Sequence, residues 1–256
     1  MAKISGSIRS FQQRPTMLII PGMWECAKLF EKWVKYFEAA GFKCIAIDLR
    51  GHGSNRDKVP DIGKVSIRDY IQDVMDEINR IDGPVVLVGH SMGGLIAQAV
   101  AATGNPKIKG LIPVCSAPPR GIRIHGQVLL RMLRPQYLKA IFGSKPLMIT
   151  RTDAIALELN QPEQHRFYEL LIPESGKAAR EIIFWQIAID AKNVKCKSMV
   201  LAGTDDKIIP AGITKNIAKK YCSEYVELPG THMLMLGESA EEAVNMMTKF
   251  INTVTF

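Results

Sequence analysis

Short apolar runs alternate with amphipathic stretches along most of this chain. The apolar runs that predict strands are Met17–Pro21, Lys43–Asp48, Val85–Gly89, Gly110–Cys115, Ser198–Gly203 and Tyr225–Leu228. The stretches with helical spacing lie near Ala27–Ala40, Ser66–Ile81, Met92–Thr103, Ala211–Tyr221 and Ala240–Thr253. This alternation is typical of an α/β fold, a mostly parallel sheet with helices on both faces. Ligands of such sheets collect at the carboxyl ends of the strands.

One long segment interrupts the alternation. Residues 117–195 separate two predicted strands, far more chain than an ordinary crossover loop needs. Helical patterns cover Gln127–Phe142 and Ala178–Ala191, and no strand-like run lies between them. We therefore expect residues 117–195 to form a helical cap over a core of residues 1–116 and 196–256. The alternative is that these helices are simply part of the core.

The sequence Gly89-His90-Ser91-Met92-Gly93-Gly94 joins the third predicted strand to a helix rich in small residues. A G-x-S-x-G turn in this context holds a serine on a sharp, strained turn above the sheet edge. The amide of Met92 then lies at a helix N-terminus, where it can donate to an oxyanion. Ser91 is the predicted nucleophile.

A serine nucleophile needs a base, and the base needs a carboxylate to orient it. His232 follows the last predicted strand, so it falls at the same edge of the sheet as Ser91 and is the predicted base. Asp206 follows the fifth predicted strand and is preferred as the acid over its neighbour Asp205, which could instead cap a loop or helix. His52 is better explained as a loop-fixing group. His90 precedes the serine, so its side chain should point away from it.

Two further histidines, His125 and His165, fall within the expected cap, where they could line a pocket or face water.

Composition narrows the possible functions. The chain has 256 residues, is 47% hydrophobic and carries a net charge of +8, with its basic residues scattered along the sequence. The charge therefore does not indicate nucleic-acid binding. We expect no signal peptide, no integral membrane segment, no metal site and no cofactor. The five dispersed cysteines are interpreted as reduced thiols of a cytoplasmic protein, either monomer or homodimer.

These motifs, taken in order, resemble those of the α/β-hydrolase superfamily. The resemblance is carried by Val88–Gly94, by Asp48-Leu49-Arg50-Gly51-His52-Gly53, by Gly203–Asp206 with Pro210, and by Gly230-Thr231-His232. It implies the α/β-hydrolase fold with an inserted helical lid, and its G-x-x-D-x-x-x-P stretch selects Asp206. It also implies a second oxyanion donor in the loop after the first parallel strand. There Pro21 replaces the family's histidine and leaves the Met23 amide as the donor. The family's first two strands would have to come from residues 1–14.

The resemblance also narrows the chemistry. Relatives similar to haloalkane dehalogenases or epoxide hydrolases carry aspartate at the elbow, so both reactions are disfavoured here. The segment around His232 resembles plant methylesterases, whose hydroxynitrile lyase relatives have a lysine where this chain has Met233. We therefore expect a serine hydrolase that cleaves small carboxylic esters. Carbon–carbon hydrolysis, perhydrolysis and a non-enzymatic ligand receptor remain alternatives, and a purely structural scaffold is disfavoured.

The expected ester site is apolar. The candidates to line it are Trp24, Leu129, Met132, Phe142 and Trp185, with Leu130 and Phe184 as further apolar cap residues. These side chains could equally form the core of the cap.

Overall fold

A single parallel sheet forms the centre of the computed structural model, which describes residues 13–124, 127–157 and 168–255. Its strands are β1 (Thr16–Ile20), β2 (Cys44–Ala46), β3 (Val85–His90), β4 (Ile108–Val114), β7 (Lys197–Gly203) and β8 (Glu224–Leu228). They lie side by side in the order β2-β1-β3-β4-β7-β8, and each pair is parallel. The predicted parallel sheet is confirmed in this part of the chain.

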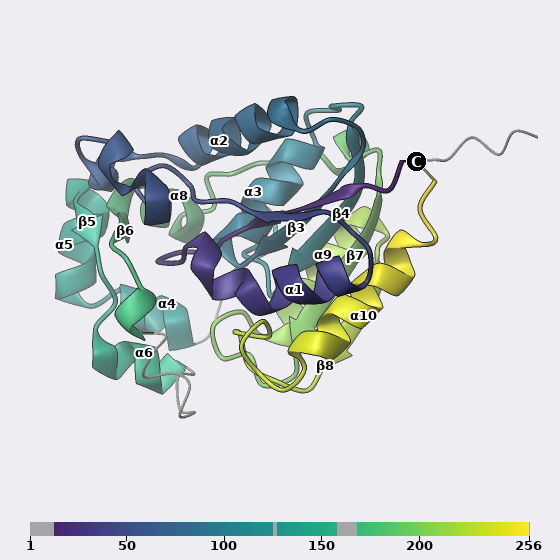
Figure 1. The fold of residues 1–256 in the computed structure, drawn as a ribbon. Helices are drawn as coiled ribbons and strands as arrows, with labels where there is room; N and C mark the ends of the chain where they lie inside the picture. Colours follow the sequence, from purple (N-terminus) through teal and green to yellow (C-terminus); the bar gives the residue numbers. More distant parts are fainter. Residues whose placement is uncertain (1–12, 125–126, 158–167, 256) are drawn as a thin grey trace, which may run out of the picture.

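Helices cover both faces of the sheet (Figure 1). The helices of this core are α1 (Glu31–Ala39), α2 (Ile67–Arg80), α3 (Met92–Ala101), α9 (Ala211–Tyr221) and α10 (Ala240–Ile251). Short 3-10 turns occupy Ala27–Phe30, Gly53–Lys58, Ile62–Lys64 and Ala191–Asn193. Along β1, Met17 and Ile19 pack into the cluster that contains α1 and α10, whereas Leu18 and Ile20 pack against α2 and α3. Successive strand side chains point to opposite faces, so one apolar strand supplies both halves of the core.

Helix α2 illustrates how the sequence sets an element's limits. The Ser66 hydroxyl accepts a hydrogen bond from the Asp69 amide, and the Asp69 carboxylate accepts one from the Ser66 amide. This capping box satisfies amide groups that a helix start leaves unpaired. Its inner face buries Ile67, Tyr70, Val74 and Ile78. The helix begins one residue after the predicted start.

The long segment between β4 and β7, residues 117–195, is called the insert below. It contains α4 (Gln127–Met132), α5 (Pro135–Gly143), α6 (Arg151–Leu157) and α8 (Gly176–Ile183). It lies beyond the carboxyl ends of the strands, at the left of Figure 1. Pro135 starts α5 and divides the helix that the sequence pattern predicts as continuous over Gln127–Phe142.

The prediction that no strand interrupts the insert is wrong. Strands β5 (Pro146–Leu147) and β6 (Glu174–Ser175) form an antiparallel pair between its helices. Each strand has two residues, too few to produce the alternation by which a strand is identified in a sequence.

A buried carboxylate, Asp153, joins three helices of the insert. It accepts hydrogen bonds of 2.6 Å from each of the Arg131 and Arg134 guanidinium groups and from the Tyr137 hydroxyl. Thr150 Oγ1 donates a further bond of 3.0 Å. Burial alone would raise the pKa of Asp153, but these donors outweigh it and lower the pKa to about 2.

A second buried carboxylate ties the insert to the core. Glu174 of β6 accepts a hydrogen bond of 2.5 Å from the Tyr70 hydroxyl of α2, and its other oxygen lies 3.1 Å from His52 Nε2. His52 and Glu174 are 1% and 0% exposed. Burial alone would lower the pKa of His52 and raise that of Glu174, but their mutual attraction reverses both shifts, so the pair is ionised. As expected, His52 fixes its loop, and it also fixes the insert.

Some of the predicted features lie partly or wholly outside the described residues. Among the described residues, no helix is both long and apolar enough to span a bilayer. The two strands that the resemblance would place in residues 1–14 fall almost wholly outside the described part, as do His125 and His165. No disulfide joins any of the five cysteines, all of which are among the described residues. Burial raises the pKa of Cys44 to about 12.

Candidate active site

The site lies where adjacent strands end. Ile20 pairs with Gly89, His90 with Val114, and Gly203 with Leu228, so these strands finish at a common edge. The loops that leave this edge carry the residues around Met23, Ser91, Asp206 and His232. Residues far apart in the sequence are thereby brought together, as expected of parallel sheets.

Ser91 occupies a sharp turn between β3 and α3. Its backbone has φ +51° and ψ −117°, a conformation that disfavours any residue with a Cβ atom. Its amide donates to Val114 O, and its carbonyl accepts from Gly94 and Ala117, so the turn is fixed on both sides. A Cβ atom on Gly93 would collide with the carbonyl oxygens of Ile20 and Pro21. Glycine at position 93 therefore lets α3 start directly against β1.

His232 and Asp206 form a buried pair. The His232 Nδ1 atom lies 2.7 Å from Asp206 Oδ2, and the two residues are 3% and 6% exposed. The other carboxylate oxygen accepts hydrogen bonds of 2.8 and 2.7 Å from the Ile208 and Ile209 amides. An ionised Asp206 requires a proton on Nδ1, which leaves Nε2 as the basic nitrogen. Asp205 instead is exposed and accepts a hydrogen bond from Thr204.

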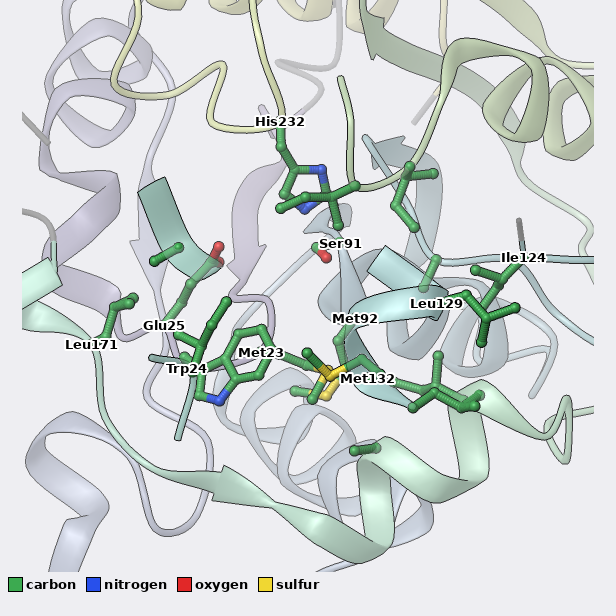
Figure 2. A pocket seen from close by; sticks show the side chains of 18 of the residues that line it. Met23, Trp24, Glu25, Ser91, Met92, Ile124, Leu129, Met132, Leu171 and His232 are labelled. Atoms are coloured by element: carbon green, nitrogen blue, oxygen red, sulfur yellow. The ribbon is translucent and has the colours of Figure 1, made fainter. Parts of the chain in front are cut away.

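Ser91 and His232 line one pocket between the core and the insert (Figure 2). The volume of this pocket is about 110 Å³. Its wall is almost entirely apolar, with Trp24, Leu129 and Met132 among the lining residues. In Figure 2 the His232 ring lies beside Ser91, with Trp24, Met23 and Met132 across the pocket. Glu25 is the one further ionisable side chain in the described lining.

The two expected oxyanion donors flank the serine. Met92 is the first residue of α3, and Met23 lies in the loop after β1; both line the pocket. The hydrogen bonds found among the described residues use neither amide. A Cβ atom on Gly22 would lie 2.9 Å from the Ser91 Cβ, which shows how closely this loop approaches the elbow. Next to Met23, Trp24 has φ +64°, and its indole Nε1 donates to Leu147 O of β5.

Two of the predicted substrate-binding residues are not brought to this pocket. Phe142 is 60% exposed at the end of α5, where its ring stacks on that of Phe184, which is 41% exposed. Trp185 packs against the core cluster that contains α2 and α3. Leu130 is 71% exposed. The sequence shows that these side chains are apolar, but it does not show which apolar side chains of the insert face the cavity.

Sequence reasoning did not find Glu25 and His90. Glu25 Oε2 accepts a hydrogen bond of 2.5 Å from the Gly22 amide, and both of its oxygens lie within 3.0 Å of His90 Nδ1. His90 Nε2 lies 2.8 Å from the backbone oxygen of His232. As expected, the His90 side chain is not the partner of Ser91. For Glu25, the signal available in the sequence was an acidic residue within the otherwise apolar segment after the first strand.

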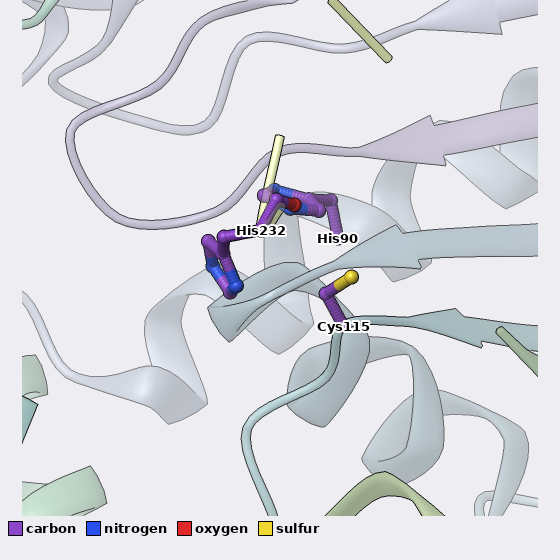
Figure 3. Close-up of side chains that lie close together, drawn as sticks. All are labelled: His90, Cys115 and His232. Carbon is purple, nitrogen blue, oxygen red and sulfur yellow. The ribbon is translucent and has the colours of Figure 1, made fainter. Parts of the chain in front are cut away.

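Three side chains of metal-binding type also meet here (Figure 3). Ligand atoms of His90, Cys115 and His232 lie within 4.8 Å of one another, and all three residues are buried. Both ring nitrogens of His90 already have hydrogen-bond partners, and so does Nδ1 of His232. A metal would have to break these bonds, so the arrangement does not fit a metal centre.

This geometry suits attack by a serine on a carbonyl group. It combines a hydroxyl on a strained turn, an imidazole oriented by a carboxylate, two amide donors and an apolar enclosure.

Comparisons with known proteins support the same fold. The model of the alpha/beta hydrolase family matches residues 17–246. The phospholipase YtpA of Bacillus subtilis is 33% identical over 112 residues, which cover 42% of this chain and 42% of the relative. A hydrolase of (E)-2-((N-methylformamido)methylene)succinate from Acinetobacter baylyi is 24% identical over 240 residues, covering 90% of this chain and 87% of the relative.

A solved structure extends the likeness to the fold as a whole. The monoacylglycerol lipase of Paleococcus ferrophilus superposes with a TM-score of 0.72 at 21% identity, covering 93% of this chain and 95% of the lipase. The chain spans less than half the length of the phospholipase that it matches.

Proposed function

The chain belongs to the alpha/beta hydrolase family, and from this premise we propose that it is a serine hydrolase that cleaves small, apolar carboxylic esters. Ser91 is the nucleophile, His232 the base and Asp206 the residue that orients the base. The Met23 and Met92 amides form the oxyanion hole. No cofactor takes part in this reaction.

The observation that carries the proposal is the hydrogen bond from His232 to Asp206 at the wall of the pocket that contains Ser91. This bond leaves His232 Nε2 as the nitrogen that accepts the serine proton. Esterase and lipase names among the relatives support a hydrolase, including a phospholipase of Bacillus subtilis and an esterase/lipase of Mycoplasma pneumoniae.

The reaction has two halves. His232 takes the Ser91 proton as the serine oxygen attacks the ester carbonyl, and the two amides stabilise the negative oxygen that forms. His232 then gives the proton to the leaving alcohol, which leaves an acyl group on Ser91. In the second half, a water molecule gives a proton to His232 and attacks the acyl carbonyl. His232 then returns that proton to Ser91 Oγ as the bond to the acyl group breaks and the acid is released.

The pocket supports the substrate class. Its described lining holds no lysine or arginine, and Leu129 and Met132 of the insert form part of an apolar wall. An uncharged acyl group loses little on leaving water for this enclosure, whereas a charged one would lie unpaired. On this proposal the insert, residues 117–195, acts as the cap that encloses the substrate, and Trp24 packs against the insert and lines the same pocket.

Adjacent aspartates provide a matched test of the triad. We expect Ser91→Ala and His232→Ala to abolish hydrolysis of short and medium p-nitrophenyl esters. Asp206→Asn should lower kcat by about 10⁴-fold, because His232 is then held in the wrong tautomer. Asp205→Asn, one residue away and exposed, should leave kcat unchanged.

An Asp205→Asn variant as impaired as Asp206→Asn would contradict the assignment of the acid. A wild-type protein that completes a single slow turnover and then stops would instead indicate a ligand receptor. Faster turnover with peroxide than with water would indicate a perhydrolase.

A further inference from the structure

We propose that Glu25 and His90 form a positioning pair that holds the oxyanion loop and the base His232 in register with Ser91. The inference rests on the proposed function and adds two residues to its site. Neither residue attacks the substrate or carries the catalytic proton. Their role is to fix the three segments that do.

Glu25 and His90 each form a hydrogen bond with the backbone of a segment that carries a proposed catalytic group. Glu25 accepts a hydrogen bond of 2.5 Å from the Gly22 amide. This bond fixes the loop that also contains Met23, whose amide is the proposed oxyanion donor. His90 precedes Ser91, and its Nε2 atom lies 2.8 Å from the carbonyl of His232. The Glu25 carboxylate joins the two halves through contacts of 2.9 and 3.0 Å to His90 Nδ1. One chain of bonds therefore spans the oxyanion loop, the elbow and the base loop.

Ring packing reinforces this chain. The His90 and His232 rings lie 4.7 Å apart between centroids, tilted by 55°. The His90 ring also packs in an edge-to-face arrangement with Phe30, with centroids 6.1 Å apart. His90 is 0% exposed and Glu25 is 3% exposed, so water cannot replace either partner at little cost. The catalytic ring is thus held by Asp206 at Nδ1 and by His90 at its face and backbone.

The proton positions follow from the acceptors. A carbonyl oxygen only accepts, so His90 Nε2 must donate to His232 O. Glu25 accepts the Gly22 amide through Oε2, and a shared proton lies between its carboxyl group and His90 Nδ1. As part of the proposal we place this proton on Nδ1, so that both ring nitrogens of His90 donate and Glu25 only accepts. Such a charge-assisted pair is shorter and stronger than a neutral one, and it carries no net charge next to the site where the oxyanion develops.

A second buried histidine–carboxylate pair in the same molecule serves as the control. His52 and Glu174 are as deeply buried as His90 and Glu25, but neither residue is among those that line the described pocket. Loss of that pair should destabilise the protein without changing the chemistry.

The test compares Glu25→Gln, His90→Gln and the double variant with wild type, using a p-nitrophenyl ester that wild type hydrolyses. We expect each single change to lower kcat by about 10- to 100-fold, because small displacements of reacting groups cost that much. KM should change little, since the apolar wall is intact. The double variant should be no slower than the worse single one, because both remove the same link. Glu174→Gln should keep the kcat of wild type.

A spectroscopic readout does not depend on activity. In protein labelled with ¹⁵N-histidine, His90 should give two slowly exchanging ring N–H signals, identified by their loss in His90→Gln. Glu25→Gln should remove the Nδ1 signal and retain the Nε2 signal, because the carboxamide can donate to Nδ1. The same spectrum of Glu174→Gln should leave both His90 signals in place.

The outcomes separate the two proposals. If wild type shows no hydrolysis that depends on Ser91, the proposed function fails. If wild type is active while Glu25→Gln and His90→Gln retain its kcat, the positioning role is wrong and the proposed function stands. A kcat loss in Glu174→Gln equal to that in Glu25→Gln would also overturn the inference, because destabilisation alone would then explain both.

Discussion

At the scale of single residues, the backbone of Ser91, the proposed nucleophile, has a strained conformation. Its positive φ places the hydroxyl in the pocket and costs about 1 to 3 kcal/mol relative to a relaxed conformation. Glycine adopts such angles without that cost. The proposed nucleophile therefore lowers the stability of the fold that holds it.

This strain can be measured by two substitutions that differ only in a Cβ atom. We expect Ser91→Gly to be more stable than Ser91→Ala by about 1 kcal/mol, because glycine relieves the strained backbone and alanine does not. The measurement is urea denaturation of both variants, each of which should be inactive. A Ser91→Gly protein less stable than Ser91→Ala would argue against strain at the elbow.

The sequence identified residues whose roles depend on local context. Ser91 has glycines around it, and Asp206 and His232 each follow a predicted strand, so position along the chain indicated a common edge. Glu25 and His90 could not be recognised in the same way. Their partnership depends on the distance between β1 and β3 and on the direction of two side chains, neither of which has a sequence pattern.

At the scale of elements, the strands and helices of the core were predicted to within a few residues, because periodicity and caps such as Ser66 are local signals. The insert was predicted less well. Its helices are held by Asp153 through contacts with residues up to 22 positions away, and its strands are two residues long. Neither feature produces a periodic pattern.

Asp153 should therefore control the order of the insert. We expect Asp153→Asn to speed amide hydrogen exchange across residues 129–154, because the half-buried Arg131 and the exposed Arg134 lose their shared anion. Exchange in β3 should not change. Lys64→Gln, which breaks a surface pair with Asp61, is the control. Equal exchange in wild type and Asp153→Asn would show that the cluster does not hold these helices.

At the scale of the whole molecule, one ionised pair joins the insert to the core, and its contribution depends on pH. The raised pKa of His52 means that this stabilisation is complete below the ordinary value of 6.5 and is lost as pH rises through the raised value. The lowered pKa of Glu174 means that it is present above 4.5 and is lost as pH falls through the lowered value. The pair contributes most between these limits.

Denaturation at two pH values tests this linkage. We expect Glu174→Gln to lower the free energy of unfolding by about 3 to 5 kcal/mol at pH 5.5, and by less at pH 9, because the stabilisation declines as pH rises through the raised pKa of His52. Arg80→Gln, which removes an exposed pair with Glu77, should cost under about 1 kcal/mol at both pH values. A loss from Glu174→Gln that is the same at pH 5.5 and pH 9 would contradict an ionised pair.

The indole of Trp24 connects the insert to the loop after β1. It hydrogen-bonds to Leu147 in the insert, and the residue before it supplies the Met23 amide. Any displacement of Leu147 relative to the core must therefore break this bond or move the loop that carries Met23. A single indole N–H thus couples the roof of the pocket to the position of one backbone amide.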